Sequence, residues 1–241
     1  RPKIINPQPS DDILERKRNY PIAWFVFFTF IIGAIGYLPW VLSSHGFIPD
    51  LMFFVYFGGV SPLLGAWIAS RVVYGKKGPK YNFGQFTLNA RQSSGWILIG
   101  LLIPIMESLG MLFLHLLFVG PFDLSTATWF EFIPAFIVFF FFALGEEFGW
   151  RGFALPHLQE KHQPAVAASM LGFIWAAWHW PHFLVKDSDM LMLYGSLWAF
   201  LIIIILNSLL YAWLYNKGKG CLMTAAALHG ATMPPWLSTS R

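Results

Sequence analysis

The stretch FIVFFFFALGEEFGWR, Phe136–Arg151, joins a run of apolar residues directly to two adjacent glutamates and an arginine. Its first part has the composition of a helix inside a lipid bilayer. An ionisable side chain at the centre of a bilayer costs about 2.5–3.5 kcal/mol on insertion scales, so such residues are usually functional. Glu146 and Glu147 are therefore the first candidate functional residues.

The composition of the whole chain is also that of a membrane protein. Of the 241 residues 56% are hydrophobic and only 12% are charged, whereas soluble domains contain about 25% charged residues. We expect an all-α, polytopic membrane helical bundle, with a cytosolic N-terminal segment at 1–20 and one transmembrane domain at 21–241. The motif-bearing core of that domain is predicted at about 130–235. The single cysteine excludes an intrachain disulfide.

The apolar runs predict about seven transmembrane helices. A helix of about 20 residues spans the roughly 30 Å hydrocarbon core, and most of the runs reach that length. The last run contains Pro234-Pro235, which must end or break its helix. The predicted segments cover residues 21–42, 51–73, 95–119, 129–153, 164–185, 190–215 and 221–237.

The basic residues predict the orientation of these segments. With a cytosolic N-terminus, every lysine and arginine except Lys186 and Arg241 falls on the cytosolic side, as the positive-inside rule expects. The net charge of +4 is then a topology signal. We expect an integral protein of the plasma membrane whose partner is the lipid bilayer, with no nucleic acid. The two glutamates should face the cytosolic half.

The polar residues inside the predicted spans suggest acid–base chemistry. Glu147 and Arg151 are spaced i,i+4 and can form an ion pair, while Glu146 points about 100° away, into a cavity. The alternative is a structural ion pair with Glu146 reaching the interface. His179, four residues after Trp175, and His229 lie on later segments. Glutamate and imidazole together can deprotonate a water molecule and pass on its proton.

The order of these motifs resembles one family, the CPBP intramembrane proteases, which includes type II CAAX prenyl endopeptidases, bacteriocin-processing proteins and Abi proteins. The resemblance covers about residues 130–235. It implies that Glu146 and His179 activate a water and that His229 stabilises an oxyanion. It also implies that the substrate is a prenylated (CAAX-type) protein or a leader peptide. The motifs that carry it are Glu146-Glu147-x-x-x-Arg151, Trp175-x-x-x-His179 and His229.

Two positions depart from the family pattern. The family has an asparagine four residues after the last histidine, where this chain has Met233. Methionine cannot donate a hydrogen bond to an oxyanion; Thr232 or Asn207 could substitute. Trp175 stands where phenylalanine is usual, which we expect to be tolerated. Reduced activity, altered specificity and a non-proteolytic member remain open.

Three further alternatives follow from the same residues. Glu146, His179 and His229 could bind zinc with an open position, but the chain has no HExxH helix, and we favour a metal-free site with Glu146 as the base. A non-catalytic scaffold and a small proton-coupled transporter are the rival functions. Helix rise also places His179 roughly 10 Å away in depth from Glu146, which is a difficulty for a shared site.

Overall fold

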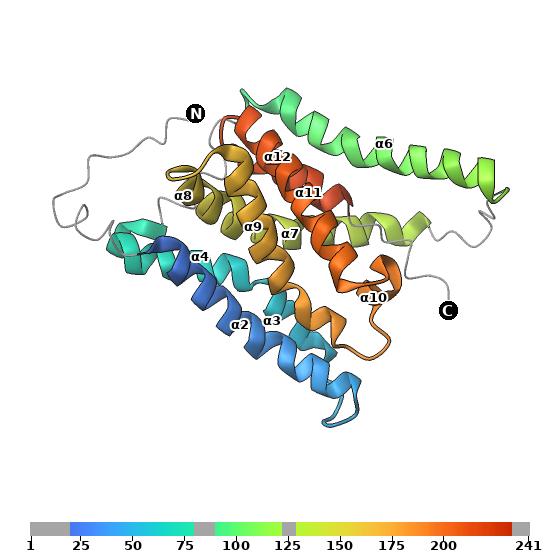
Figure 1. Cartoon of the computed structure of the whole chain (residues 1–241), viewed down its shortest axis with the longest axis horizontal. Coiled ribbons are helices and arrows are strands. Elements are labelled where there is room, and N and C mark those ends of the chain that lie inside the picture. The colour runs from blue at the N-terminus through green and yellow to red at the C-terminus, as the bar shows by residue number, and fades with distance from the viewer. Residues whose placement is uncertain (1–19, 80–89, 122–128, 233–241) are drawn as a thin grey trace.

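The computed structural model describes residues 20–79, 90–121 and 129–232, and the ordered elements in these ranges are all helical (Figure 1). The all-α prediction is thereby confirmed. The longer helices are α2 (Pro21–Ser44), α4 (Ser61–Tyr74), α6 (Ser94–Phe118), α7 (Trp129–Gly149), α9 (Pro164–Trp178), α11 (Leu197–Lys217) and α12 (Leu222–Thr232). The shorter elements are η1 (Met52–Phe54), α3 (Val55–Gly59), η2 (Gly75–Lys77), η4 (Trp150–Ala154), α8 (Leu155–Gln159), η5 (Trp180–Phe183) and α10 (Asp189–Tyr194).

Each predicted segment corresponds to helix, but the later ones differ from the prediction in their ends. The segment predicted at 190–215 is broken at Gly195, whose φ of 70° ends α10. The helix predicted at 164–185 ends at Trp178 and continues as the 3-10 turn η5. Within the described residues, the segment predicted at 221–237 forms only the 11-residue α12, about 16 Å long at 1.5 Å per residue. This described part of the segment is buried along most of its length, and residues 233–237 of the prediction lie outside the described residues.

Among the residues that the structure describes, four stretches are long and apolar enough to cross a membrane by length and composition: Pro21–Ser44, Met52–Lys77, Ser94–Phe118 and Leu197–Lys217. Their outer surfaces carry large apolar side chains, and the C-terminal half of α6 is the most extreme case. There Met111 is 69% exposed and Phe118 is 81% exposed. Apolar surface of this extent is unfavourable in water and favourable against lipid.

Small residues bring the helices into close contact. A Cβ atom built on Gly65 of α4 would lie 2.1 Å from the hydroxyl oxygen of Thr29 on α2. One built on Gly149, at the end of α7, would lie 2.5 Å from the carbonyl oxygen of Pro62 on α4. Small residues at such crossings are typical of membrane helices, because close backbone approach replaces the hydrophobic driving force between helices.

The segment that carries the glutamates is longer than predicted, which removes the depth difficulty. After α7 the chain continues without a break through the π-helical turn η4 and through α8 to Gln159. Glu146 therefore lies thirteen residues before the end of this helical segment, or about 20 Å along it. His179 lies fifteen residues after the start of α9 at Pro164, or about 22 Å. The two depths agree.

Candidate active site

Glu146 is held by two tryptophan side chains. Its Oε2 atom accepts hydrogen bonds from Nε1 of Trp150 at 3.4 Å and from Nε1 of Trp175 at 3.1 Å. Trp150 lies one helical turn after Glu146, whereas Trp175 comes from α9. The residue is 6% exposed, and both of these bonds use the same oxygen. The other carboxylate oxygen, Oε1, is therefore left for a substrate or a water.

Glu147 is fully buried and has a different environment. Its Oε1 atom accepts a hydrogen bond from Nη1 of Arg151 at 2.9 Å, which confirms the predicted i,i+4 ion pair. The same oxygen accepts a hydrogen bond from Nδ1 of His229 at 2.9 Å. Glu147 thus connects its own helix to α12, a contact that the spacing in the sequence did not indicate.

Arg151 lies between two aromatic rings. Its guanidinium carbon is 4.7 Å from the ring centroid of Trp175 and 4.9 Å from that of Tyr211, distances at which cation–π attraction is favourable. Its Nη2 atom contacts the hydroxyl of Ser208 at 3.4 Å, and this hydroxyl donates to the carbonyl of Ala168 at 2.8 Å. The buried cation is therefore compensated by one carboxylate, two rings and a hydroxyl.

His179 lies at the end of α9, and its hydrogen bond determines its tautomer. Its Nδ1 atom is 3.0 Å from the carbonyl oxygen of Trp175. A carbonyl only accepts, so Nδ1 carries the hydrogen and Nε2 of the neutral ring is an acceptor. The His179 ring also packs against the rings of Trp178 at 4.6 Å and of His182 at 5.5 Å.

His229 lies on α12, with its ring 5.2 Å from Trp175 and 5.5 Å from Tyr211. Because Nδ1 donates to the Glu147 carboxylate, Nε2 is the atom available for chemistry. His229 thus contacts Trp175, the residue that also bonds Glu146 and His179. The candidate residues from three separate segments therefore come together.

Trp175 contacts more of the candidate residues than its motif predicts. Its indole nitrogen bonds Glu146, its backbone carbonyl bonds His179, and its ring contacts His229 and the Arg151 guanidinium. A phenylalanine at this position would supply the ring but not the N–H donor. The indole N–H of Trp175 therefore adds an interaction with Glu146 that a phenylalanine could not make.

The remaining predicted site residues are placed as follows. Asn207 is half-buried on α11, and it is the next residue, Ser208, that bonds Arg151 and α9. Met233 lies outside the described residues. Within the ranges described, no group of three or more His, Cys, Asp or Glu side chains is arranged to hold a metal ion, and the choice between a zinc site and a metal-free site stays a prediction.

Several residues of the site were not predicted from the sequence. Trp150 could have been found, because it follows Glu146 at i,i+4 spacing. Ser208 and Tyr211 share a face of α11 at i,i+3 spacing, but no motif marks them. Tyr37 of α2 is within electrostatic range of Glu146, although its segment carries none of the motifs.

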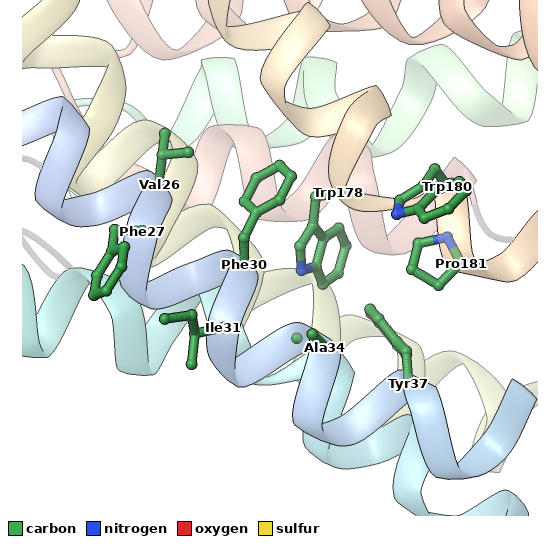
Figure 2. A pocket seen from close by; sticks show the side chains of 10 residues that line it. Val26, Phe27, Phe30, Ile31, Ala34, Tyr37, Trp178, Trp180 and Pro181 are labelled. Carbon is green, nitrogen blue, oxygen red and sulfur yellow. The ribbon is translucent and has the colours of Figure 1, made fainter. Parts of the chain in front are cut away.

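An apolar groove of about 420 Å³ lies beside the site, between α2 and the end of α9 (Figure 2). Tyr37 of α2 and Trp178 of α9 are two of its lining residues. The Trp178 ring is 5.8 Å from the Trp150 ring as well as 4.6 Å from the His179 ring. The groove is lined by Val26, Phe27, Phe30, Ile31, Gly33, Ala34, Tyr37, Trp178, Trp180 and Pro181.

The fold and site define a polytopic integral membrane protein with a buried glutamate–histidine centre at the junction of α7, α9, α11 and α12. Residues 127–233 match the family described as type II CAAX prenyl endopeptidase Rce1-like. CAAX prenyl protease 2 of Methanococcus maripaludis is 28% identical over 116 residues, which are 46% of this chain and 41% of that protein. The resemblance to CAAX prenyl proteases is therefore confirmed.

The matched range contains Glu146, Glu147, Arg151, Trp175, Ser208, Tyr211 and both histidines of the site. The alignment with the archaeal relative spans less than half of that protein's length. The bacteriocin-processing and Abi branches of the resemblance stay predictions.

Proposed function

We propose that this protein is an intramembrane endopeptidase that hydrolyses a peptide bond in a prenylated substrate. This proposal rests on the contacts that Trp175 makes with the candidate residues. One residue of α9 holds Glu146 through its side chain, orients His179 through its carbonyl and packs against His229. Glu146 and His179, which the motifs select for water activation, are thus both bonded to the same buried tryptophan.

The proposed reaction begins with a water molecule between Glu146 and His179. His179 accepts a hydrogen bond from the water at Nε2 and orients it, while Oε1 of Glu146 takes its proton as general base. The resulting hydroxide attacks the carbonyl carbon of the scissile bond. Glu146 then returns the proton to the leaving amine nitrogen as the C–N bond breaks, so protons and charge balance.

His229 acts on the oxyanion in this scheme. In this scheme the ring is an imidazolium, with Nδ1–H bound to Glu147 and Nε2–H donating to the negatively charged oxygen. A preorganised donor of this kind contributes about 2.7–4 kcal/mol to lowering the barrier. Arg151 offsets part of the Glu147 charge and fixes the position of its carboxylate. We therefore assign Glu147 and Arg151 as positioning residues.

The proposed substrate class is supported by the apolar groove and by the name of the matched relative. The matched archaeal protein is called a prenyl protease, and the groove between α2 and η5 is lined almost entirely by apolar side chains. A hydrocarbon chain attached to the substrate would bury its surface there at roughly 25 cal/mol per Å². We expect prenylated peptides to be preferred over leader peptides. The lysine and arginine distribution supports a site in the cytosolic half of the plasma membrane.

Cleavage by purified protein in proteoliposomes tests the proposal. A farnesylated peptide and a leader-peptide set are compared for the parent, Glu146→Gln and His179→Ala, with exposed Glu160→Gln as the control. We expect the parent and Glu160→Gln to cleave the farnesylated peptide, and the two site variants to lose at least 100-fold. Equal cleavage by all four proteins would exclude the assignment. An inactive parent that folds normally would favour the scaffold or, if solute uptake is seen, the transporter.

A further inference from the structure

A pair of hydroxyl groups lies at the C-terminal end of α12, next to His229. The hydroxyl of Thr232 donates to the carbonyl oxygen of His229 at 2.8 Å, and the hydroxyl of Tyr211 lies 3.0 Å from Thr232 Oγ1. Because the Thr232 hydrogen is directed at a carbonyl, Tyr211 must donate to Thr232. The two groups form a directed chain from α11 to α12.

Tyr211 and Thr232 differ in how freely their hydroxyl groups can reorient. The Tyr211 side chain is 2% exposed; its ring packs against Trp175 at 5.7 Å and against the Arg151 guanidinium at 4.9 Å. Thr232 is half-buried and follows His229 at i,i+3, so both project from the same face of α12. The hydroxyl hydrogen of threonine can turn about the C–O bond at little cost. The tyrosine is fixed, and the threonine hydrogen can be redirected.

We propose that the Thr232 hydroxyl donates a hydrogen bond to the oxyanion, in the role that the family pattern gives to an asparagine at position 233. This proposal rests on the proposed function above and names a further catalytic residue for it. During the reaction the hydroxyl hydrogen leaves the His229 carbonyl and turns to the oxyanion. No covalent bond changes in this step.

Tyr211 is the positioning residue of this pair. Its O–H bond to Thr232 Oγ1 holds the threonine oxygen in place and polarises the remaining O–H group. Hydrogen-bond chains strengthen each member by about 10–30%. The aromatic ring of Tyr211 has a separate task, because it covers the buried Arg151 cation. A Tyr211→Phe variant removes the first task and keeps the second.

Steady-state cleavage of the farnesylated peptide tests the proposal. Thr232→Val keeps the side-chain shape without the hydroxyl and should lower kcat by about 100- to 1,000-fold with KM within a factor of about two. Thr232→Ser should keep kcat within about fivefold of the parent, because it retains a hydroxyl donor. Tyr211→Phe should lower kcat about tenfold, the effect of weakening one hydrogen bond. Thermal unfolding should be similar for the Val and Ser variants.

A second change at position 233 separates a chemical role from a structural one. Met233→Asn in the Thr232→Val background should restore kcat at least tenfold, since the amide supplies the missing donor. Asn207→Leu, the alternative donor, should leave kcat unchanged. Parent-like kcat in Thr232→Val, equal losses in the Val and Ser variants, or failure of Met233→Asn to restore activity would overturn the proposal. If the parent cleaves and Glu146→Gln does not, the proposed function stands in each of these cases.

Discussion

Glu147 and His229 lie on different helices, and a 2.9 Å hydrogen bond joins Glu147 Oε1 to His229 Nδ1. The same oxygen also pairs with Arg151. One buried carboxylate therefore connects the ion pair of the first motif to the histidine of the last. The two adjacent glutamates have different surroundings: Glu147 binds Arg151 and His229, whereas Glu146 accepts from two tryptophans through Oε2 alone.

Removing the charge of Glu147 should destabilise the protein. Glu147→Gln leaves the Arg151 cation buried without its partner, which costs about 3–5 kcal/mol. The Glu147→Gln/Arg151→Met double variant should lose less stability than the two single variants together, because the pair is coupled. Unfolding in detergent measures both. Exposed Glu160→Gln should unfold like the parent, and additive losses in the double variant would contradict the coupling.

His179→Asn should distinguish the roles of the two ring nitrogens of His179. The asparagine amide can keep the hydrogen bond that Nδ1 gives to the Trp175 carbonyl, but it has no group at the position of Nε2. We expect a folded protein whose cleavage rate falls at least 100-fold. His162→Asn, at an exposed position in the turn before α9, is the control. Retention of parent activity by His179→Asn would mean that Nε2 takes no part.

Gly149 should be intolerant of a side chain. A Cβ atom there would lie 2.5 Å from the Pro62 carbonyl oxygen, and neither backbone can move without separating α7 from α4. We expect Gly149→Ala to lower the free energy of unfolding by about 1–3 kcal/mol. Gly145 lies one turn earlier in α7 and has open space at its Cβ position. Equal stability of Gly149→Ala and Gly145→Ala would contradict the close crossing.

Filling the apolar groove should weaken substrate binding. Ala34 lines the groove, and Ala34→Phe would occupy part of its volume (Figure 2). Loss of hydrophobic contact with a prenyl chain should raise KM about tenfold, with kcat little changed because the site residues stay in place. Leu38→Phe, also on α2 but exposed outside the groove, is the matched control. An unchanged KM in Ala34→Phe would place the prenyl chain elsewhere.

The sequence by itself determined the fold class and the approximate helical segments, and it selected the candidate site residues. Apolar runs such as 95–119 become α6 (Ser94–Phe118) because a helix satisfies every backbone group where no water is present. The Glu147–Arg151 pair was predictable because i,i+4 neighbours on a helix are fixed by local geometry. Histidines among tryptophans at 175–182 were recognisable by composition alone.

Only the tertiary structure decided which groups meet. The bonds from Trp175 to Glu146, from His229 to Glu147 and from Tyr211 to Thr232 join helices that are distant in the chain, and no periodicity encodes such pairs. The depth of the site also depended on it, because η4 and α8 extend the segment that carries Glu146 beyond its apolar run. The EEFGWR motif selected the candidate residues, whereas packing between α7, α9, α11 and α12 decided the partners of Glu146, Glu147 and Arg151.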